Sequence, residues 1–265
     1  MMPTKPTLNV IKIGGNIIDD PAACKAFLHA FAGVAGAKIL IHGGGKIATQ
    51  IAEKLHVETQ LIDGRRITNL PMLDVVTMVY GGLVNKNLVA QLQAHLCHAI
   101  GLTGADAGIV KAIKRPVGAV DYGFVGDIEA VDAPQIGRFL SQGLVPVIAP
   151  LTYDATGTML NTNADTMASA VAVAMADDFN VNLVYCFEKK GVLNDPNDDD
   201  SVISTLDFAH FKTLKTTGAI NKGMIPKLDN AFGALQNGVA NVTICHAQQL
   251  EQATQQLAGT TLKYG

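Results

Sequence analysis

Short apolar segments alternate along the chain with stretches in which apolar residues recur every three or four positions. Five segments rich in Val, Ile and Leu are typical of buried strands: 8–13, 38–42, 144–149, 182–187 and 241–245. Three stripes at helical spacing lie between or after them, at 47, 51 and 55, at 76, 80, 84 and 88, and at 228, 232 and 235. Strands that are apolar throughout must be covered on both faces. The pattern therefore predicts an α/β chain with a mainly parallel sheet between layers of helices.

Two stretches depart from this alternation. Residues 111–131 contain two short alternating segments around Pro116 and Tyr122, which favour hairpins, and we expect them beside the ligand site. Residues 194–200 are polar and carry four aspartates, which predicts a surface loop because the glycine and terminal glutamate of a calcium-binding EF-hand are missing. The pair Asp177-Asp178 follows an alanine-rich helix and suggests a boundary between lobes 1–177 and 178–265.

Composition narrows the classes of partner. The 265 residues carry 20 Lys+Arg against 23 Asp+Glu, a net charge of −3, and 48% of them are hydrophobic. Such a chain can bury a large core, and it has no excess of positive charge for nucleic acid or an anionic membrane. Apolar runs such as 168–176 are shorter than the roughly 20 residues of a membrane span. Four scattered cysteines, without a CxxC pair or metal-ligand spacing, predict reduced thiols and a cytoplasmic location.

Two glycine-rich turns each follow a predicted strand. The first ends the segment 10–16, and the second, Gly43-Gly44-Gly45, leads into the helical stripe that starts at Ile47. Such turns suit anions, because unpaired N–H groups and the positive end of the helix dipole point outward. Neither is a Walker loop. Residues 43–48 also satisfy G-x-G-x-x-A with Asp63 beyond, so an NAD-dependent dehydrogenase remains an alternative.

Two lysines stand where a bound anion would explain them. Lys12 interrupts an apolar strand just before Gly14-Gly15, and Lys227 opens the helix that carries the stripe from Leu228. A lysine in an apolar strand must escape the core or meet an anion, and a cation in the first turn of a helix opposes the dipole. The alternatives are a snorkelling Lys12 and a solvated Lys227.

A polar motif precedes the alanine-rich helix. Asn161, Asn163 and Asp165 occupy alternate positions. If the segment is extended, they face one side and offer two amides and a carboxylate to one site. The alternative is an ordinary helix N-cap formed by Asn163 or Asp165.

Taken in order, these motifs resemble the amino-acid kinase family, and within it the enzymes that phosphorylate an N-acylated glutamate. The resemblance runs through six motifs and covers almost the whole chain: 10–15, 42–45, 63–68, 160–165, 223–227 and 259–260. It implies a three-layer αβα sandwich with an open sheet. The implied reaction is ATP-dependent phosphorylation of the side-chain carboxylate of N-acetyl-L-glutamate to N-acetyl-L-glutamyl 5-phosphate in arginine biosynthesis. N-succinyl-L-glutamate is the alternative substrate, and a non-catalytic amino-acid-binding module is the alternative class.

The resemblance also implies roles for individual residues. Catalysis falls to Lys12 and Lys227, which contact the transferring phosphoryl group, and to Asp165, which holds both ammonium groups. The phosphate is expected at Gly14, Gly15 and Gly44, and the acyl-glutamate at Gly44, Gly45, Arg66, Asn161 and Asn163 in the N-terminal lobe. The nucleotide is expected in the C-terminal lobe, at Glu188, Lys189, Lys190, Gly191, Val192, Leu193, Ala219, Ile220 and Asn221.

The expected cofactor is ATP with Mg²⁺, in which the nucleotide phosphates carry the metal and no all-protein metal site is predicted. Nine residues precede Val10, which favours the dimeric type of relative over the arginine-inhibited hexameric type. The helical stretch 71–98 is the candidate interface of this homodimer.

Overall fold

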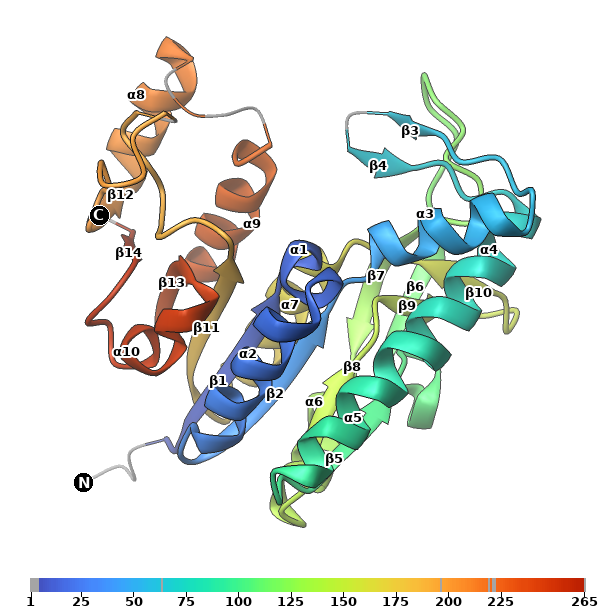
Figure 1. Ribbon diagram of the computed structural model, residues 1–265, viewed down its shortest axis with the longest axis horizontal. Coiled ribbons are helices and arrows are strands. Elements are labelled where there is room, and N and C mark those ends of the chain that lie inside the picture. The colour runs from blue at the N-terminus through green and yellow to red at the C-terminus, as the bar shows by residue number, and fades with distance from the viewer. Residues whose placement is uncertain (1–4, 63, 196, 219, 221–222, 265) are drawn as a thin grey trace. The chain divides into compact units, whose positions relative to one another are not determined.

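The computed structural model describes residues 5–62, 64–195, 197–218, 220 and 223–264 (Figure 1). Within them, helices and strands alternate along the chain. The chain divides into two compact units, one made of Met1–Ile39 with Ala168–Gly265 and the other of Leu40–Met167. No helix among the described residues is long and apolar enough to cross a membrane.

The sheet of the first unit has the strand order β12-β14-β13-β11-β1. Its strands are β1 (Thr7–Ile13), β11 (Asn180–Phe187), β12 (Thr205–Asp207), β13 (Asn241–His246) and β14 (Thr260–Lys263). β11 pairs in parallel with both β1 and β13, whereas β14 runs antiparallel to β13. Every residue of β1 after Thr7 is buried, which explains its unbroken apolar run.

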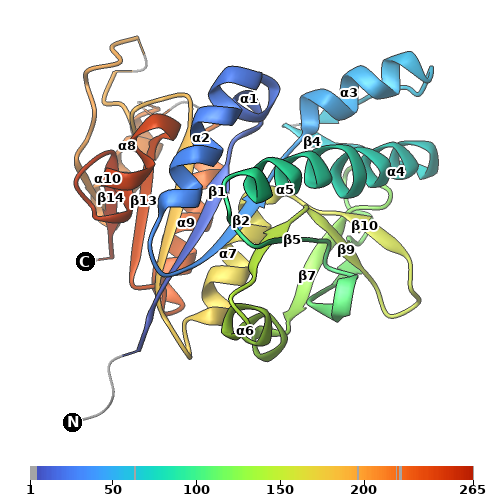
Figure 2. The ribbon, with the colours of Figure 1, turned by 60° about the horizontal axis from the view of Figure 1, so that its bottom comes forward.

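Helices pack on both faces of this sheet (Figure 2). α2 (Pro21–Gly33) and the short α10 (Leu250–Thr254) lie together on one face, and α9 (Ile225–Gln236) lies on the other. The remaining helices are α1 (Gly15–Asp19), α8 (Phe208–Thr217) and a 3₁₀ turn at Ala247–Gln249. Phe211 and Phe232 stack across α8 and α9 with ring centroids 5.1 Å apart, and both are buried in the core of this unit.

The second unit contains three groups of strands. β2 (Ala37–His42), which belongs to this unit from Leu40 on, pairs in parallel with β8 (Val145–Ile148), and β8 pairs in parallel with β5 (Ala99–Leu102). A second sheet has the order β10 (Met159–Asn161), β9 (Leu151–Tyr153), β6 (Val110–Lys114), β7 (Gly126–Val131). β3 (Leu61–Ile62) and β4 (Arg65–Arg66) form a small antiparallel ribbon.

The helices of the second unit are α3 (Gly45–Lys54), α4 (Leu70–Val76), α5 (Asn85–Ala94) and α6 (Ala133–Ser141), with a 3₁₀ turn at Asp106–Gly108. A π-helical stretch, Thr77–Val84, joins α4 to α5 without a break. α7 (Ala164–Met175) begins in the second unit and continues into the first. The hydrophobic stripe at 76, 80, 84 and 88 therefore follows one long helix that changes its winding midway.

Most predicted elements are confirmed. The five predicted strands correspond to β1, β2, β8, β11 and β13, and the α/β class with mainly parallel pairing holds. The irregular region 111–131 contains the antiparallel pair β6 and β7, as the hairpin interpretation predicted. The predicted lobes 1–177 and 178–265 do not coincide with the compact units, because β1 and α2 group with the C-terminal part of the chain. The assignment of one ligand to each lobe stays a prediction.

Candidate functional site

In the first unit, the turn after β1 is fastened to the turn after β11. The two strands are parallel, and Ile13 lies opposite Cys186, so both end at the same edge of the sheet. The N–H of Gly14 donates to the carbonyl of Cys186 at 2.9 Å. Beyond it, Asn16 Nδ2 donates to Glu188 Oε1 at 2.7 Å. The N–H of Gly14 is therefore engaged in a bond between the two turns, which favours a structural role for Gly14 over the predicted contact with phosphate. Gly15 is the first residue of α1.

The ring of Phe187 brings the two predicted lysines together. Phe187 is the last residue of β11 and stacks on Tyr185. Lys12 Nζ lies 4.7 Å from the centroid of the Phe187 ring, and Lys227 Nζ lies 4.3 Å from the same centroid. The negative face of an aromatic ring attracts cations, so one ring can hold both ammonium groups. Two positive charges therefore lie near the end of β1 and the start of α9, and such an arrangement suits an anionic ligand.

Lys12 is buried, with 6% of its surface exposed, so the snorkelling alternative is wrong. Lys227 lies in the first turn of α9, as predicted, and is half-buried rather than solvated. Sequence reasoning did not single out Phe187. The one signal available was its position at the end of an apolar strand, directly before the polar segment 188–190.

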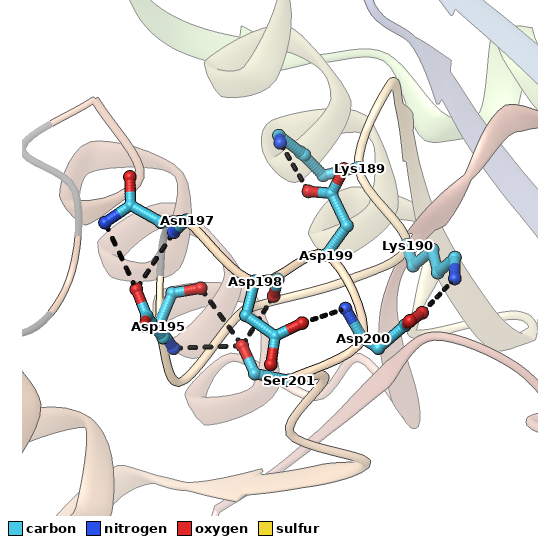
Figure 3. Close-up of polar contacts among 8 residues, drawn as sticks. All are labelled: Lys189, Lys190, Asp195, Asn197, Asp198, Asp199, Asp200 and Ser201. Carbon is cyan, nitrogen blue, oxygen red and sulfur yellow. Dashed lines mark hydrogen bonds and ion pairs between the residues drawn. The ribbon is translucent and has the colours of Figure 1, made fainter.

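The predicted nucleotide residues fall into two groups. Glu188, Lys189 and Lys190 are exposed, and the two lysines form ion pairs with Asp199 and Asp200 of the acidic loop (Figure 3). This confirms 194–200 as a surface loop among its described residues. Gly191 and Val192 are buried and Leu193 is half-buried. The turn is fixed where Val192 N–H donates to Thr260 Oγ1 at 2.8 Å, which gives the Gly259-Thr260 motif a structural role.

Ile220, also predicted to bind nucleotide, is buried. Its neighbours Ala219 and Asn221, also predicted to bind nucleotide, lie outside the described residues, as does Asp63 of the alternative dinucleotide motif.

In the second unit, β2 passes into α3 through the glycine turn. Gly44 has φ = 149°, a conformation that side-chain-bearing residues rarely adopt, and a Cβ there would lie 3.1 Å from Tyr80 and 3.2 Å from Val84. α3 begins without a side-chain cap, and its first backbone bond runs from Ala48 N–H to the carbonyl of Gly44 at 2.9 Å. The N–H groups that precede Ala48 and the positive end of the helix dipole are therefore suited to an anion, and anion binding at this turn stays a prediction.

Arg66 reaches this turn from β4. Its Nη2 donates to the carbonyl of Gly45 and to Thr49 Oγ1, both at 2.8 Å. Arg66 is half-buried, whereas Arg65 is exposed, and the choice of Arg66 for the substrate stays a prediction. A guanidinium has five N–H donors, so others remain for a carboxylate. Burial raises the pKa of Tyr80 beside it, and the Arg66 charge partly offsets that rise.

Asn161 is linked to the segment that follows β4. Its Nδ2 donates to Thr68 Oγ1 at 2.9 Å, and Thr68 Oγ1 donates to the carbonyl of Arg66 at 3.3 Å. The structure thus brings Arg66 to the Gly44 and Gly45 turn at the start of α3, and it links Asn161 to the backbone of Arg66 through Thr68. It adds Thr49, Thr68 and Tyr80, to which sequence reasoning gave no role.

The prediction that Asn161, Asn163 and Asp165 share one face of an extended segment is wrong. Only Asn161 belongs to a strand, because α7 begins at Ala164. Asn163 caps that helix: its Oδ1 accepts from the N–H groups of Asp165 at 2.9 Å and Thr166 at 3.0 Å. This is the alternative N-cap interpretation, and it commits the Asn163 oxygen to the backbone. Asp165 is buried in the first turn of α7.

Comparison with known proteins decides the family. The sequence model of the amino acid kinase family matches residues 7–246. The chain belongs to this family. It is 59% identical over 244 residues to a Cytophaga hutchinsonii protein named acetylglutamate kinase, covering 92% of each chain. A protein of the same name from Phocaeicola vulgatus is 51% identical, with 98% of this chain and 99% of the relative covered. The crystal structure of smu.665 from Streptococcus mutans is 29% identical and superposes with a TM-score of 0.80, covering 97% of this chain and 98% of that one.

His42, the last residue of β2, opens the motif 42–45, but the sequence analysis gave it no role. Its side chain is fully buried, and Nδ1 lies 2.7 Å from the carbonyl oxygen of Gly43. Burial lowers the pKa of His42 to about 4. The carbonyl of Gly43 opposes this shift in the pKa and the Lys86 ammonium adds to it. The imidazole is therefore neutral at physiological pH.

This buried histidine predicts a loss of stability in acid. Between pH 6.5 and about 4, the unfolded chain binds a proton at His42 that the folded chain does not bind. The contribution of His42 to the free energy of unfolding is therefore fully present above that window and is lost as pH falls through it. We expect His42 to remove about 2 kcal/mol of unfolding free energy between roughly pH 7.5 and roughly pH 5. Urea unfolding of the parent and of His42→Asn at both pH values isolates this contribution. An equal pH dependence in the two proteins would contradict it.

Proposed function

We propose that the protein is an acetylglutamate kinase that transfers the γ-phosphoryl group of ATP to the side-chain carboxylate of N-acetyl-L-glutamate. The products are N-acetyl-L-glutamyl 5-phosphate and ADP, in a step of arginine biosynthesis. Membership of the amino acid kinase family and the names of relatives at 59% and 51% identity support this function. The observation that carries the chemistry is the placement of Lys12 and Lys227 over one ring.

The proposed chemistry needs only alignment and charge. A carboxylate oxygen attacks the γ-phosphorus, the new P–O bond forms, and the bond to the β-phosphate oxygen breaks with its electrons leaving on ADP. The nucleophile is already ionised, so no general base and no covalent enzyme intermediate are required. Cations and backbone N–H groups that stabilise the charge of the transferring group then account for most of the rate.

The residue roles follow the two units. In the first, Lys12, Lys227 and the N–H of Gly15 bind the transferring phosphoryl group. In the second, the Gly44 and Gly45 turn receives the reacting carboxylate, Arg66 binds the α-carboxylate and Asn161 bonds the amide. Asp165 keeps the role that the resemblance implies, orienting the two ammonium groups.

MgATP is the proposed phosphoryl donor, with Mg²⁺ carried by the nucleotide phosphates. We assign the nucleotide to 188–193 and 219–221 in the C-terminal part. Lys189 and Lys190 are paired with Asp199 and Asp200, so the phosphates of a nucleotide bound there would compete with these two carboxylates for the lysines.

We also propose a cytoplasmic homodimer whose interface includes the long helix within 71–98. Supporting this, Leu70, Met78 and Leu83 expose 58%, 54% and 46% of their surfaces along that helix. Several large exposed apolar side chains along one helix are typical of a surface that another chain covers.

The direct test is a phosphoryl-transfer assay. The protein is incubated with ATP, Mg²⁺ and either N-acetyl- or N-succinyl-L-glutamate, and the acyl phosphate is trapped with hydroxylamine. We expect hydroxamate from the acetyl substrate. Hydroxamate from the succinyl substrate alone would change the assigned acyl group, and NAD binding without phosphoryl transfer would favour the dehydrogenase alternative.

The lysine pair predicts a loss of rate without a loss of fold. Lys12→Ala and Lys227→Ala should each lower kcat by about 10²- to 10³-fold, because each removes a cation that acts mainly on the transition state. Lys25→Ala, at an exposed position of α2, is the matched control. Steady-state kinetics beside thermal melting checks this. A kcat within about threefold of the parent in both variants would remove the mechanism.

Arg66 predicts a selective effect on one substrate. Arg66→Lys should raise KM for the acyl-glutamate much more than KM for ATP, because lysine loses the planar fork that binds a carboxylate through two bonds. Arg65→Lys, on the exposed neighbour, should change neither value by more than about twofold. Equal effects of Arg66→Lys on both substrates would place Arg66 elsewhere in the mechanism.

A further inference from the structure

We propose that His42 and Asn85 are positioning residues, a buried pair that sets the Gly43–Gly44 peptide so that the N–H of Gly44 is directed away from the His42 ring, toward bound substrate. The inference rests on the proposed function in one respect, the assignment of Gly44 as a contact of the reacting carboxylate or its phosphate. The rest depends on hydrogen bonds within the second unit.

Both side chains are completely buried. His42 ends β2 and Asn85 begins α5, and each has 0% of its surface exposed. α5 packs on β5 and β8 (Figure 1). Asn85 reaches the carbonyl of Val147 in β8. A buried amide and a buried imidazole are costly unless their polar atoms are bonded. Their partners therefore define how each side chain must be oriented.

The partners of Asn85 fix which end of its amide is which. Lys86 Nζ lies 3.0 Å from Asn85 Oδ1, and Asn85 Nδ2 lies 2.9 Å from the carbonyl oxygen of Val147. An ammonium can only donate and a carbonyl can only accept. The oxygen must face Lys86 and the NH₂ group must face Val147, so the amide has one allowed orientation.

This orientation fixes the tautomer of His42. Asn85 Nδ2 also lies 3.1 Å from His42 Nε2, and as a pure donor it requires Nε2 to accept. A neutral imidazole carries one proton, which must then be on Nδ1. Nδ1–H donates to the carbonyl of Gly43 at 2.7 Å. The two hydrogen bonds of the ring require the same tautomer: Nε2 accepts from the Asn85 amide, and Nδ1–H donates to the carbonyl of Gly43.

The bond to Gly43 orients the next N–H. The described chain contains no cis peptide bond, and in a trans peptide the C=O and N–H point in opposite directions. Holding the Gly43 oxygen against the His42 ring therefore turns the Gly44 N–H away from it. Residues 43–45 are all glycine, so none of them has a side chain that restricts its own backbone dihedrals. The His42 bond supplies the restraint that the glycine turn lacks.

Gly101 shows that β5 makes room for this network. A Cβ at Gly101 would lie 2.0 Å from Asn85 Oδ1 and 2.8 Å from Lys86 Nζ. Lys86 Nζ in turn donates to the carbonyl of Gly101 at 2.9 Å. The strand can hold no side chain here without displacing the amide that sets the tautomer.

Two substitutions separate positioning from packing. Asparagine can place an amide N–H where Nδ1 of His42 lies, and glutamine can place an amide acceptor where Nε2 lies. His42→Asn should keep the bond to Gly43 and lose the bond to Asn85, whereas His42→Gln should do the reverse. Each variant loses one buried bond, so a purely structural role predicts similar damage in both.

We expect kcat of His42→Asn to exceed kcat of His42→Gln by about tenfold or more, with KM for ATP unchanged in both, because only the asparagine variant still orients the Gly44 N–H. Thermal melting of both variants measures the structural cost alongside. Equal kcat values, or the reverse order, would overturn the inference.

A second measurement does not depend on turnover or on the variants folding. Nitrogen-15 spectra of the histidine ring in the parent protein should show His42 neutral at pH 7 with its proton on Nδ1. A proton on Nε2, or an imidazolium ring, would overturn the inference even in an active enzyme. A parent protein with the expected tautomer and no phosphoryl transfer would instead overturn the proposed function and leave the orientation of the peptide intact.

Discussion

The parallel register of β1 against β11 is the constraint on which the lysine pair depends. Because both strands end at one edge, the backbone of Gly14 can bond Cys186 and the side chain of Lys12 can meet the ring of Phe187. A shift of one residue would turn Lys12 to the other face of the sheet. A row of amides holds the register near the opposite ends of these strands, where Asn182 Nδ2 donates to Asn9 and Asn241 Nδ2 donates to Asn182. By holding the register, this row of amides helps to place Lys12 at the opposite edge of the sheet, beside Phe187.

The two units present groups suited to anions, and these groups are of different kinds. The first offers ammonium groups on long side chains, held over an aromatic ring. The second offers backbone N–H groups at the start of α3, braced by Arg66 through the carbonyl of Gly45. With a net charge of only −3, the protein has no overall positive field to attract phosphate and carboxylate groups. Such ligands must be bound by local arrangements, and both lie where strands give way to helices or turns.

Buried polar groups carry specificity in this fold. His42 and Asn85 are surrounded by the core, and each satisfies the other only in one tautomer and one amide orientation. A network of this kind is favourable when every member is bonded and costly when one is missing. It therefore gives the flexible glycine turn a defined geometry. Apolar packing alone could not do so, because it has no direction.

The sequence by itself determined the strands, the two glycine turns and the unusual placement of Lys12 and Lys227, because these follow from local periodicity and from the cost of a charge in an apolar strand. The tertiary structure decided which distant residues meet. The meeting of Lys12 and Lys227 at Phe187, of Arg66 with Gly45, and of Asn85 with His42 depends on packing between segments far apart in the chain. The tertiary structure also corrected the interpretation of Asn163, whose side chain caps the helix that begins at Ala164. Alternate spacing indicates a shared face only if the backbone is extended, and the backbone there turns into a helix because its unpaired N–H groups need an acceptor.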